Sequence, residues 1–247
     1  MRYHIDTIPV WDALKKGGEC SLCRLRAKIE RTDVERYLGA SVMEPDTRLR
    51  VNAVGFCPRH QSLLFAQPNR LGHALMTHTR LIEVEKQLLP ALARMKSGKS
   101  GSLFKRDGAS PMKAAAQTVR EITGGCVICE SIEDNMRRYA YTFLHLYKTD
   151  DSFRKAFRES RGVCLKDLAL LCDMADEALS AKEQQAFAED LETIETAYLK
   201  KLEQDIEWFT LKFDYRNADK PWNDSRDALE RTVNALRGRC VGEVKDE

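Results

Sequence analysis

The sequence predicts an all-α protein built by tandem duplication of one helical unit. Apolar residues recur three and four positions apart over long stretches, which is typical of one face of a helix. No pair of alternating runs flanks a two-residue turn that would indicate a β-hairpin. A C-x-x-C motif and a later cysteine-containing helix start both recur, 106 and 107 residues further along the chain. Two features repeated in the same order at nearly one offset indicate an internal repeat.

The bulk composition allows one large domain or two modest ones. The chain has 247 residues with 43% hydrophobic content, which is enough for a core. The formal net charge is only +2, so composition alone demands neither nucleic acid nor a membrane. Residues 1–111 carry a formal charge of +8 and the remainder −6. This asymmetry fits two halves that attract each other, and the alternative is a basic binding face.

Targeting and membrane segments are not expected. The N-terminal stretch "MRYHIDTIPVWDAL" has no apolar core of the kind found in signal peptides. No apolar run approaches the roughly 18 residues that a membrane span needs. We therefore expect a soluble cytoplasmic protein without membrane contact.

The first repeat is expected over residues 1–95. A lead-in helix ends at "KKGGECSLC", where two glycines suit a helix end that turns sharply. An amphipathic helix follows, and "GFCPRH" opens another. A long helix closes the repeat, with an apolar stripe that we expect to be buried. The stripe consists of Leu71, Leu75, Leu81, Ile82, Val84, Leu88, Leu89 and Leu92.

A linker and the second repeat follow. Residues 96–111, "KSGKSGSLFKRDGASP", are rich in Ser, Gly and Lys and predict a flexible linker. Residues 112–247 repeat the plan with "REITGGCVIC" and "GVCLKD", followed by a long helix. Ser180 and Glu183 form the pattern of a capping box at the start of that helix. We expect the two repeats to pack into one helical bundle.

The cysteines predict metal sites. Eight cysteines in a reducing compartment favour metal or redox chemistry over disulfides. Cys20 and Cys23 form a knuckle, and Cys57 and His60, three residues apart, share a helix face. Three thiolates and one imidazole make a closed tetrahedral zinc shell, which we expect as site 1. The alternative is a set of unconnected buried thiols and a surface histidine.

The second site is expected from Cys126, Cys129, Cys164 and Asp167. Here aspartate stands where the first repeat has histidine, and three interpretations remain open. Asp167 binds the metal directly, or it leaves a bound water and acts as the general base of a hydrolytic enzyme, or the site holds no metal. Substitute ligands could come from two further side chains, His145 and Cys172.

Iron is the alternative metal, because the same ligands can hold it. A thiol-based redox or metal sensor is a further alternative, since exposed thiolates can oxidise and release the ion. No P-loop and no nucleophile–histidine–acid arrangement is supported. A structural-metal scaffold is therefore favoured over an enzyme.

Two polar stretches are candidates for partner binding: a mixed-charge loop at residues 42–52 and a helix–helix corner at residues 212–225. The cations of the corner could grip phosphate and its aromatic rings could stack on bases, so the partner is expected to be a protein or a nucleic acid. The alternative for the corner is that its aromatic rings pack inward and Asp214 pairs with Arg216. The candidate contacts are Glu44, Asp46, Arg48, Arg50, Asn52, Lys212, Tyr215, Arg216 and Trp222.

Four segments together resemble a known family. They are "RYHIDTIPVWDAL", "ECSLC", "SVMEPDTRLRVNAVGFCPRH" and "KFDYRNADKPW". Over nearly the whole chain they resemble an uncharacterised bacterial family, found mainly in anaerobic Gram-positive bacteria and described as a domain of unknown function. The resemblance implies a cytoplasmic protein with paired cysteine motifs and implies no particular activity. In the family pattern the second motif also carries histidine, so Asp167 is a departure that makes site 2 less expected than site 1.

Overall fold

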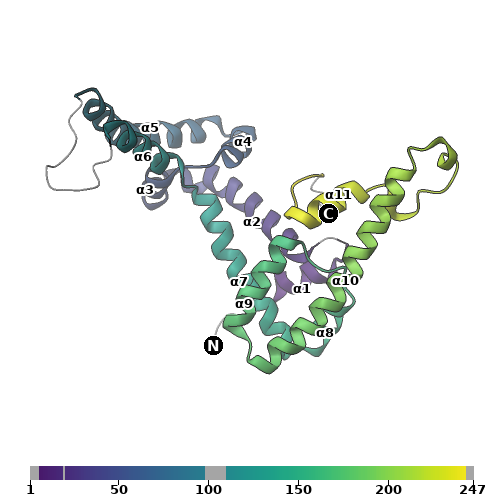
Figure 1. Cartoon of the computed structure of the whole chain (residues 1–247). Helices are drawn as coiled ribbons and strands as arrows, with labels where there is room; N and C mark the ends of the chain where they lie inside the picture. Colours follow the sequence, from purple (N-terminus) through teal and green to yellow (C-terminus); the bar gives the residue numbers. More distant parts are fainter. Residues whose placement is uncertain (1–5, 19, 98–109, 243–247) are drawn as a thin grey trace. The chain divides into compact units, whose positions relative to one another are not determined.

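The computed structural model describes residues 6–18, 20–97 and 110–242, and these residues form helices and no strand (Figure 1). The prediction of an all-α protein is confirmed. The α-helices are α1 (Thr7–Lys15), α2 (Ser21–Leu38), α3 (Pro45–Val54), α4 (Pro58–Ala66), α5 (Arg70–Ser97), α6 (Pro111–Thr123), α7 (Val127–Thr149), α8 (Asp151–Arg158), α9 (Leu165–Ala178), α10 (Ala181–Leu211) and α11 (Ala228–Arg237). The short 3-10 turns are η1 (Ala40–Met43), η2 (Tyr215–Asn217) and η3 (Asn223–Ser225).

The helix order supports the duplication. Helices α1 to α5 are followed by α6 to α10 in the same succession of lead-in, knuckle helix, short helix, cysteine-opened helix and long helix. The two cysteine-opened helices begin alike: Gly55 and Gly162 have φ of 84° and 90°. Cys57 and Cys164 then cap α4 and α9 with φ of −72° and ψ of 166° and 158°. A positive φ is reached at low cost by glycine, which explains why both copies carry it.

The described residues fall into two compact units that do not follow the repeats. Unit 1 comprises residues 1–28 and 134–247, and unit 2 comprises residues 29–133. The expected division into 1–95 and 112–247 therefore differs from the compact units. Helices α2 and α7 cause the difference, because each contributes its first turns to one unit and the rest of its length to the other. Of the expected linker, residues 98–109 lie outside the described residues, and Ser97 and Pro111 already belong to α5 and α6.

Unit 1 has an aromatic core formed by α7, α8 and α10. The ring of Phe143 on α7 lies edge-on to Phe153 and Phe157 of α8, with ring centroids 4.9 and 5.0 Å apart. Tyr147 and Phe187 add a similar pair at 4.9 Å. Edge-to-face packing adds about 0.5–1.5 kcal/mol per pair beyond the burial of apolar area. This core packs α7, α8 and α10 of unit 1 against one another.

The Ser180 cap at the start of α10 is confirmed. The Glu183 carboxylate accepts a hydrogen bond from the Ser180 backbone N–H at 2.8 Å, and the structure forms the complete capping box. The cap fixes where α10 begins after α9.

In unit 2, α5 packs along α6 and α3. The apolar stripe of α5 is less buried than the sequence predicts: Leu71, Leu81 and Leu89 are 71%, 53% and 58% exposed. Among the described residues, α3, α4, α6 and η1 pack on this long helix and leave these positions uncovered, whereas Met76 is 1% exposed. The expectation of a buried stripe was therefore wrong for these leucines.

The stretch 42–52 is not a loop. It forms η1 and then α3, which begins at Pro45. Proline suits the first turn of a helix, because the backbone N–H that it lacks would have no helical partner there. The alternating charges of this stretch are therefore side chains of a helix.

Candidate metal centres

Among the described residues, each compact unit contains one cluster of four potential metal ligands, and within each cluster the ligand atoms all lie within 4.8 Å of one another. The histidine centre, in unit 2, consists of Cys57, His60, Cys126 and Cys129. The aspartate centre, in unit 1, consists of Cys20, Cys23, Cys164 and Asp167.

The eight residues singled out from the sequence are these eight, but the expected grouping was wrong. The C-x-x-C motif of each repeat meets the cysteine-opened helix of the other repeat. The length of α2 explains the exchange. This 18-residue helix leads the chain away from Cys23, and it rises about 1.5 Å per residue. His60 returns to α2 only at Glu30, seven residues beyond Cys23, or about 10 Å along the axis.

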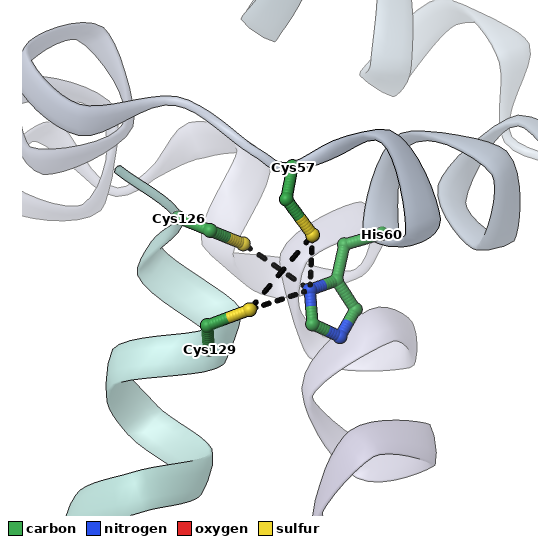
Figure 2. A group of neighbouring side chains, drawn as sticks. All are labelled: Cys57, His60, Cys126 and Cys129. Carbon is green, nitrogen blue, oxygen red and sulfur yellow. Dashed lines mark hydrogen bonds between the residues drawn. The ribbon is translucent and has the colours of Figure 1, made fainter. Parts of the chain in front are cut away.

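The histidine centre has the spacing of a tetrahedral site (Figure 2). His60 Nδ1 lies 3.3, 3.1 and 3.4 Å from the sulfurs of Cys57, Cys126 and Cys129. The sulfurs of Cys57 and Cys129 are 3.8 Å apart. A zinc ion bonded at about 2.3 Å to sulfur and about 2.0–2.1 Å to nitrogen sets tetrahedral edges of about 3.8 Å and 3.5 Å. These four side chains therefore fit one four-coordinate ion.

Backbone contacts hold the two halves of the histidine centre together. The Val127 N–H donates to the Gly55 carbonyl at 3.1 Å, which joins the knuckle of one repeat to the helix start of the other. Arg80 on α5 donates to carbonyls at the ends of α3 and α6, and these ends lead into the two halves of the cluster. The accepting carbonyls belong to Asn52, Ala53 and Ile122, at 2.5, 3.1 and 2.7 Å.

The far side of the His60 ring is held by Glu30. His60 Nε2 lies 3.1 Å from Glu30 Oε1, and Arg59 donates twice to the same carboxylate at 2.7 Å. Burial opposes charge on Glu30, but the hydrogen bonds from Arg59 and His60 lower its pKa to about 2. Burial likewise opposes charge on His60, but hydrogen bonds to Cys126 and Glu30 raise its pKa to about 10. Nδ1 thus faces the sulfurs while Nε2 donates outward, as in metal-bound histidines.

The aspartate centre places Asp167 at the fourth corner. Asp167 Oδ2 lies 3.4, 3.3 and 3.2 Å from the sulfurs of Cys20, Cys23 and Cys164. The other oxygen, Oδ1, accepts a hydrogen bond from Arg26 at 2.8 Å. Asp167 is fully buried. The carboxylate therefore occupies the position that His60 has in the other centre, and it is not set back behind a water position.

The acidic groups of the aspartate centre crowd one another. Burial raises the pKa of Cys20, and a hydrogen bond to Cys164 raises that of Cys23. Burial, followed by the charge of Cys164, raises the pKa of Asp167. Hydrogen bonds from Cys20 and Cys23 lower the pKa of Cys164 to about 2. Burial and mutual crowding oppose negative charge on Cys20, Cys23 and Asp167. A divalent cation at this site would favour the charged forms of all four groups.

The two centres differ in exposure. In the histidine centre Cys129 is exposed and Cys57 is half-buried. The aspartate centre is buried, but a pocket of about 170 Å³ reaches the three cysteines of the centre from the side of α10 and α11. Tyr198 also lines this pocket. Asp167 does not line it, so this pocket gives small molecules access to the sulfur side of the centre.

The proposed substitute ligands lie elsewhere. His145 and Cys172 belong to neither cluster, and both are on the surface. The sequence interpretation missed Arg26 and Glu30, which hold the fourth ligands from outside. Their position was a usable signal: they follow Cys23 by three and seven residues on one helix, so they share a face with the knuckle.

The candidate partner contacts of residues 44–52 serve mainly within unit 2. Arg48 donates to the Val42 carbonyl at 3.3 Å and to Thr79 Oγ1 at 3.1 Å, which ties α3 to η1 and α5. Arg50 pairs with Glu130 at 3.0 Å. The Asn52 carbonyl belongs to the Arg80 cluster described above. Glu44 and Asp46 are exposed at the start of α3.

The corner at residues 212–225 in unit 1 is partly internal. The buried Lys212 ammonium donates to three carbonyls, those of Asn217, Ala218 and Lys220, at 2.7, 2.8 and 2.6 Å. Arg216 pairs with Asp214, as the alternative interpretation predicted. Trp222 packs on Phe209 with ring centroids 5.9 Å apart. Tyr215, however, is 87% exposed, and Phe213 is 76% exposed, so these two rings do not pack inward.

Comparison with known proteins gives a family and no activity. Residues 1–243 match the model of a family described as "Family of unknown function (DUF6062)". No curated protein and no solved structure matches the chain. Among the described residues, no helix has both the length and the apolar character required to cross a membrane.

Proposed function

The chain belongs to the DUF6062 family, whose function is unknown, and we propose that it is a binding scaffold stabilised by two structural zinc ions, one in each compact unit. The observation that carries this proposal is the spacing of the ligand atoms. In both centres one nitrogen or oxygen atom faces three sulfurs at 3.1–3.4 Å. Closed four-ligand shells dominated by thiolate are typical of structural zinc.

The spacing favours one ion per centre. Because the ligand atoms lie within 4.8 Å of one another, they surround a single ion and leave no room for a cluster of several irons. A single iron remains chemically possible with these ligands. Zinc fits better, because zinc in structural sites is almost always four-coordinate and tetrahedral, with ligands of these same types.

The structural role follows from the distances along the chain that each ion would close. Cys23 and Cys164 are 141 residues apart, and His60 and Cys126 are 66 residues apart. Closing loops of this length costs conformational entropy, and metal binding supplies folding free energy to offset that cost. Each ion would therefore stabilise a contact between the two repeats.

A hydrolytic role for the aspartate centre is less well supported. Catalytic zinc keeps an open position for water. Here Asp167 Oδ2 fills the fourth corner, and the residue is fully buried. Asp167 thus acts as a ligand in this proposal and not as a general base.

The partner of the scaffold is proposed to be a protein that contacts the corner at residues 212–225. Exposed Phe213 and Tyr215 offer an apolar contact there. The cations of the corner are engaged within the chain: Lys212 donates to carbonyls, Arg216 pairs with Asp214, and Lys220 donates to Asn217 Oδ1 at 2.8 Å. A phosphate-binding role is therefore disfavoured. Binding to single-stranded nucleic acid that weakens steeply with salt would contradict this choice of partner.

Elemental analysis of protein purified without chelator or metal-affinity resin tests the zinc proposal. We expect two zinc ions per chain. The Cys57→Ser and His60→Ala variants should each lose one ion and melt at a lower temperature. Cys172→Ser and Cys240→Ser are matched controls, because both thiols are exposed and lie outside the clusters. A wild-type chain that folds without bound metal would overturn the proposal. Iron found in place of zinc would change the identity of the proposed metal.

One observation favours a second candidate function, that of a thiol-based sensor. Cys129 is exposed, and its sulfur lies 3.8 Å from that of Cys57. A peroxide could oxidise these two thiolates to a disulfide, with two protons taken up, two waters formed from hydrogen peroxide and the ion released. Release of one zinc ion at low peroxide, reversed by a thiol reductant, would support this function. Loss of both ions together, or of neither, would count against it.

A further inference from the structure

Arg26 and Glu30 lie one turn apart on α2, and each contacts the fourth ligand of one centre. The Arg26 guanidinium donates to Asp167 Oδ1 at 2.8 Å in unit 1. The Glu30 carboxylate lies 3.1 Å from His60 Nε2 in unit 2. The Asp167 side chain is 1% exposed and that of His60 is 2% exposed, so solvent screens neither contact effectively. We propose that Arg26 and Glu30 are positioning residues that decide which side chain can serve as the fourth metal ligand of each centre.

This inference rests on the proposal that both centres bind metal. The fourth ligand of each centre has two atoms that could bind the ion. Asp167 could in principle chelate an ion with both oxygens. Arg26 holds Oδ1, so Oδ2 alone faces the three sulfurs. His60 could present either nitrogen. Glu30 accepts at Nε2, so Nδ1 faces the sulfurs. In both centres the residue on α2 selects the donor atom. Residues that hydrogen-bond to a metal ligand without touching the metal commonly orient the ligand in this way.

Charge gives the second argument. A carboxylate in place of an imidazole adds one negative charge to a shell that already has three thiolates. In a buried site an extra charge of that kind is costly unless an opposite charge pairs with it. Arg26 supplies that charge beside Asp167. An imidazole that binds the ion through Nδ1 is neutral and needs no opposite charge. The residue that contacts it on α2 is instead an acceptor, Glu30, whose charge Arg59 balances at 2.7 Å.

The exchanged combinations are unfavourable in each centre. A histidine at position 167 would point its outer N–H at the guanidinium of Arg26, so a donor would face a donor. An aspartate at position 60 would place its outer oxygen against the carboxylate of Glu30. Either arrangement leaves a buried polar group without a partner, which costs about 1–3 kcal/mol in proteins. The aspartate in "GVCLKD" is thus matched to Arg26 and is not a lost ligand.

A charge exchange in the aspartate centre tests the proposal. The single variants Asp167→His and Arg26→Glu should each weaken metal binding at that centre about 10- to 100-fold, the range known for outer partners. The double variant Arg26→Glu/Asp167→His should recover most of the loss, because Glu at position 26 can accept from the new imidazole. Arg36→Glu is the matched control: Arg36 is also on α2 and forms an ion pair, with Asp33, away from both clusters.

Cobalt(II) substitution supplies a readout that a purely structural role would not move. Each cobalt ion reports its ligands through its visible absorption bands. In the double variant the spectrum should change to that of two centres with imidazole ligands. The Arg36→Glu variant should keep the wild-type spectrum and two ions per chain.

Two results would overturn the proposal: Asp167→His binding metal as tightly as the double variant, or Arg26→Glu keeping wild-type affinity and spectrum. Failure of the wild type to bind two ions would instead defeat the metal proposal on which this one depends. If Arg26→Glu does not fold, Arg26→Gln and Glu30→Gln replace it. Each removes one outer charge and should weaken only its own centre, at least about 10-fold, and unchanged affinity in both would again overturn the proposal.

Discussion

The sulfur of Cys20 lies 3.4 Å from Oδ2 of Asp167, although the two residues are 147 positions apart. This contact joins the knuckle of the first repeat to the cysteine-opened helix of the second. The reciprocal contact, Cys126 Sγ to His60 Nδ1 at 3.1 Å, joins the other two halves. Each centre is therefore assembled from both repeats. Neither repeat by itself supplies all four ligands of either centre.

Paired cysteine substitutions test this exchange directly. In the histidine centre, Cys57→Ser/Cys126→Ser removes two ligands of one site, and we expect the loss of one zinc ion. Cys20→Ser/Cys57→Ser removes one ligand from each site, and we expect the loss of both ions. The grouping by sequence order predicts the opposite for the two pairs. Metal content per chain, measured by elemental analysis of folded protein, separates the two arrangements.

Glycine substitutions test the helix start before Cys164. In a Gly162→Ala variant the new methyl group would lie 2.7 Å from Glu195 Oε1, at a φ of +90°. Glu195 accepts the Val163 N–H at 2.7 Å, so this change also disturbs the position of Cys164. Left-handed strain of about 1–2 kcal/mol and overpacking of about 1–3 kcal/mol should together lower the free energy of unfolding.

The control for this prediction is Gly17→Ala. Gly17 has a φ of +61° and no atom within 4 Å of its added methyl group. Only the backbone strain of about 1–2 kcal/mol applies there. Urea unfolding of the metal-loaded protein measures both variants. Equal losses at the two positions would contradict the packing argument.

Arg80 should matter for one centre only. Its three hydrogen bonds to carbonyls hold the ends of α3 and α6, which lead into the histidine centre. Removing the charged donor in Arg80→Met should cost at least about 2 kcal/mol, because hydrogen bonds to charged groups contribute about 1.5–3 kcal/mol each. Zinc bound at the histidine centre should then be lost to a chelator sooner, while the aspartate centre serves as the internal reference. Equal acceleration at both centres would show that Arg80 acts on general stability.

The corner at residues 212–225 allows stability to be separated from binding. Lys212→Met removes an ammonium that donates to three carbonyls, and we expect the free energy of unfolding to fall by about 2 kcal/mol or more. Tyr215→Ser changes a side chain that is 87% exposed, and its effect should stay within about 0.5 kcal/mol. Urea unfolding compares the two. A large loss in Tyr215→Ser would mean that this ring is structural and is not a free contact surface.

Local features could be predicted from the sequence, because neighbouring residues determine them. The helical class follows from the spacing of apolar residues. The cap of α10 follows from Ser180 and Glu183, and the matching helix starts follow from Gly55 and Gly162. The stripe on α5 was misjudged because periodicity identifies a helix face but not whether another element covers it. The stretch 42–52 was misjudged because its charges obscured the helix start at Pro45.

The sequence by itself determined the ligand types: six cysteines, His60 and Asp167, at spacings that place each pair on one turn. Only the tertiary structure decided which pairs meet, because the length of α2 carries the chain away from Cys20 and Cys23 before His60 returns to it at Glu30. It also decided the meaning of Asp167. A carboxylate in the place of an imidazole is explained by an opposite charge beside it, and Arg26, 141 residues earlier in the chain, lies there only in the folded protein.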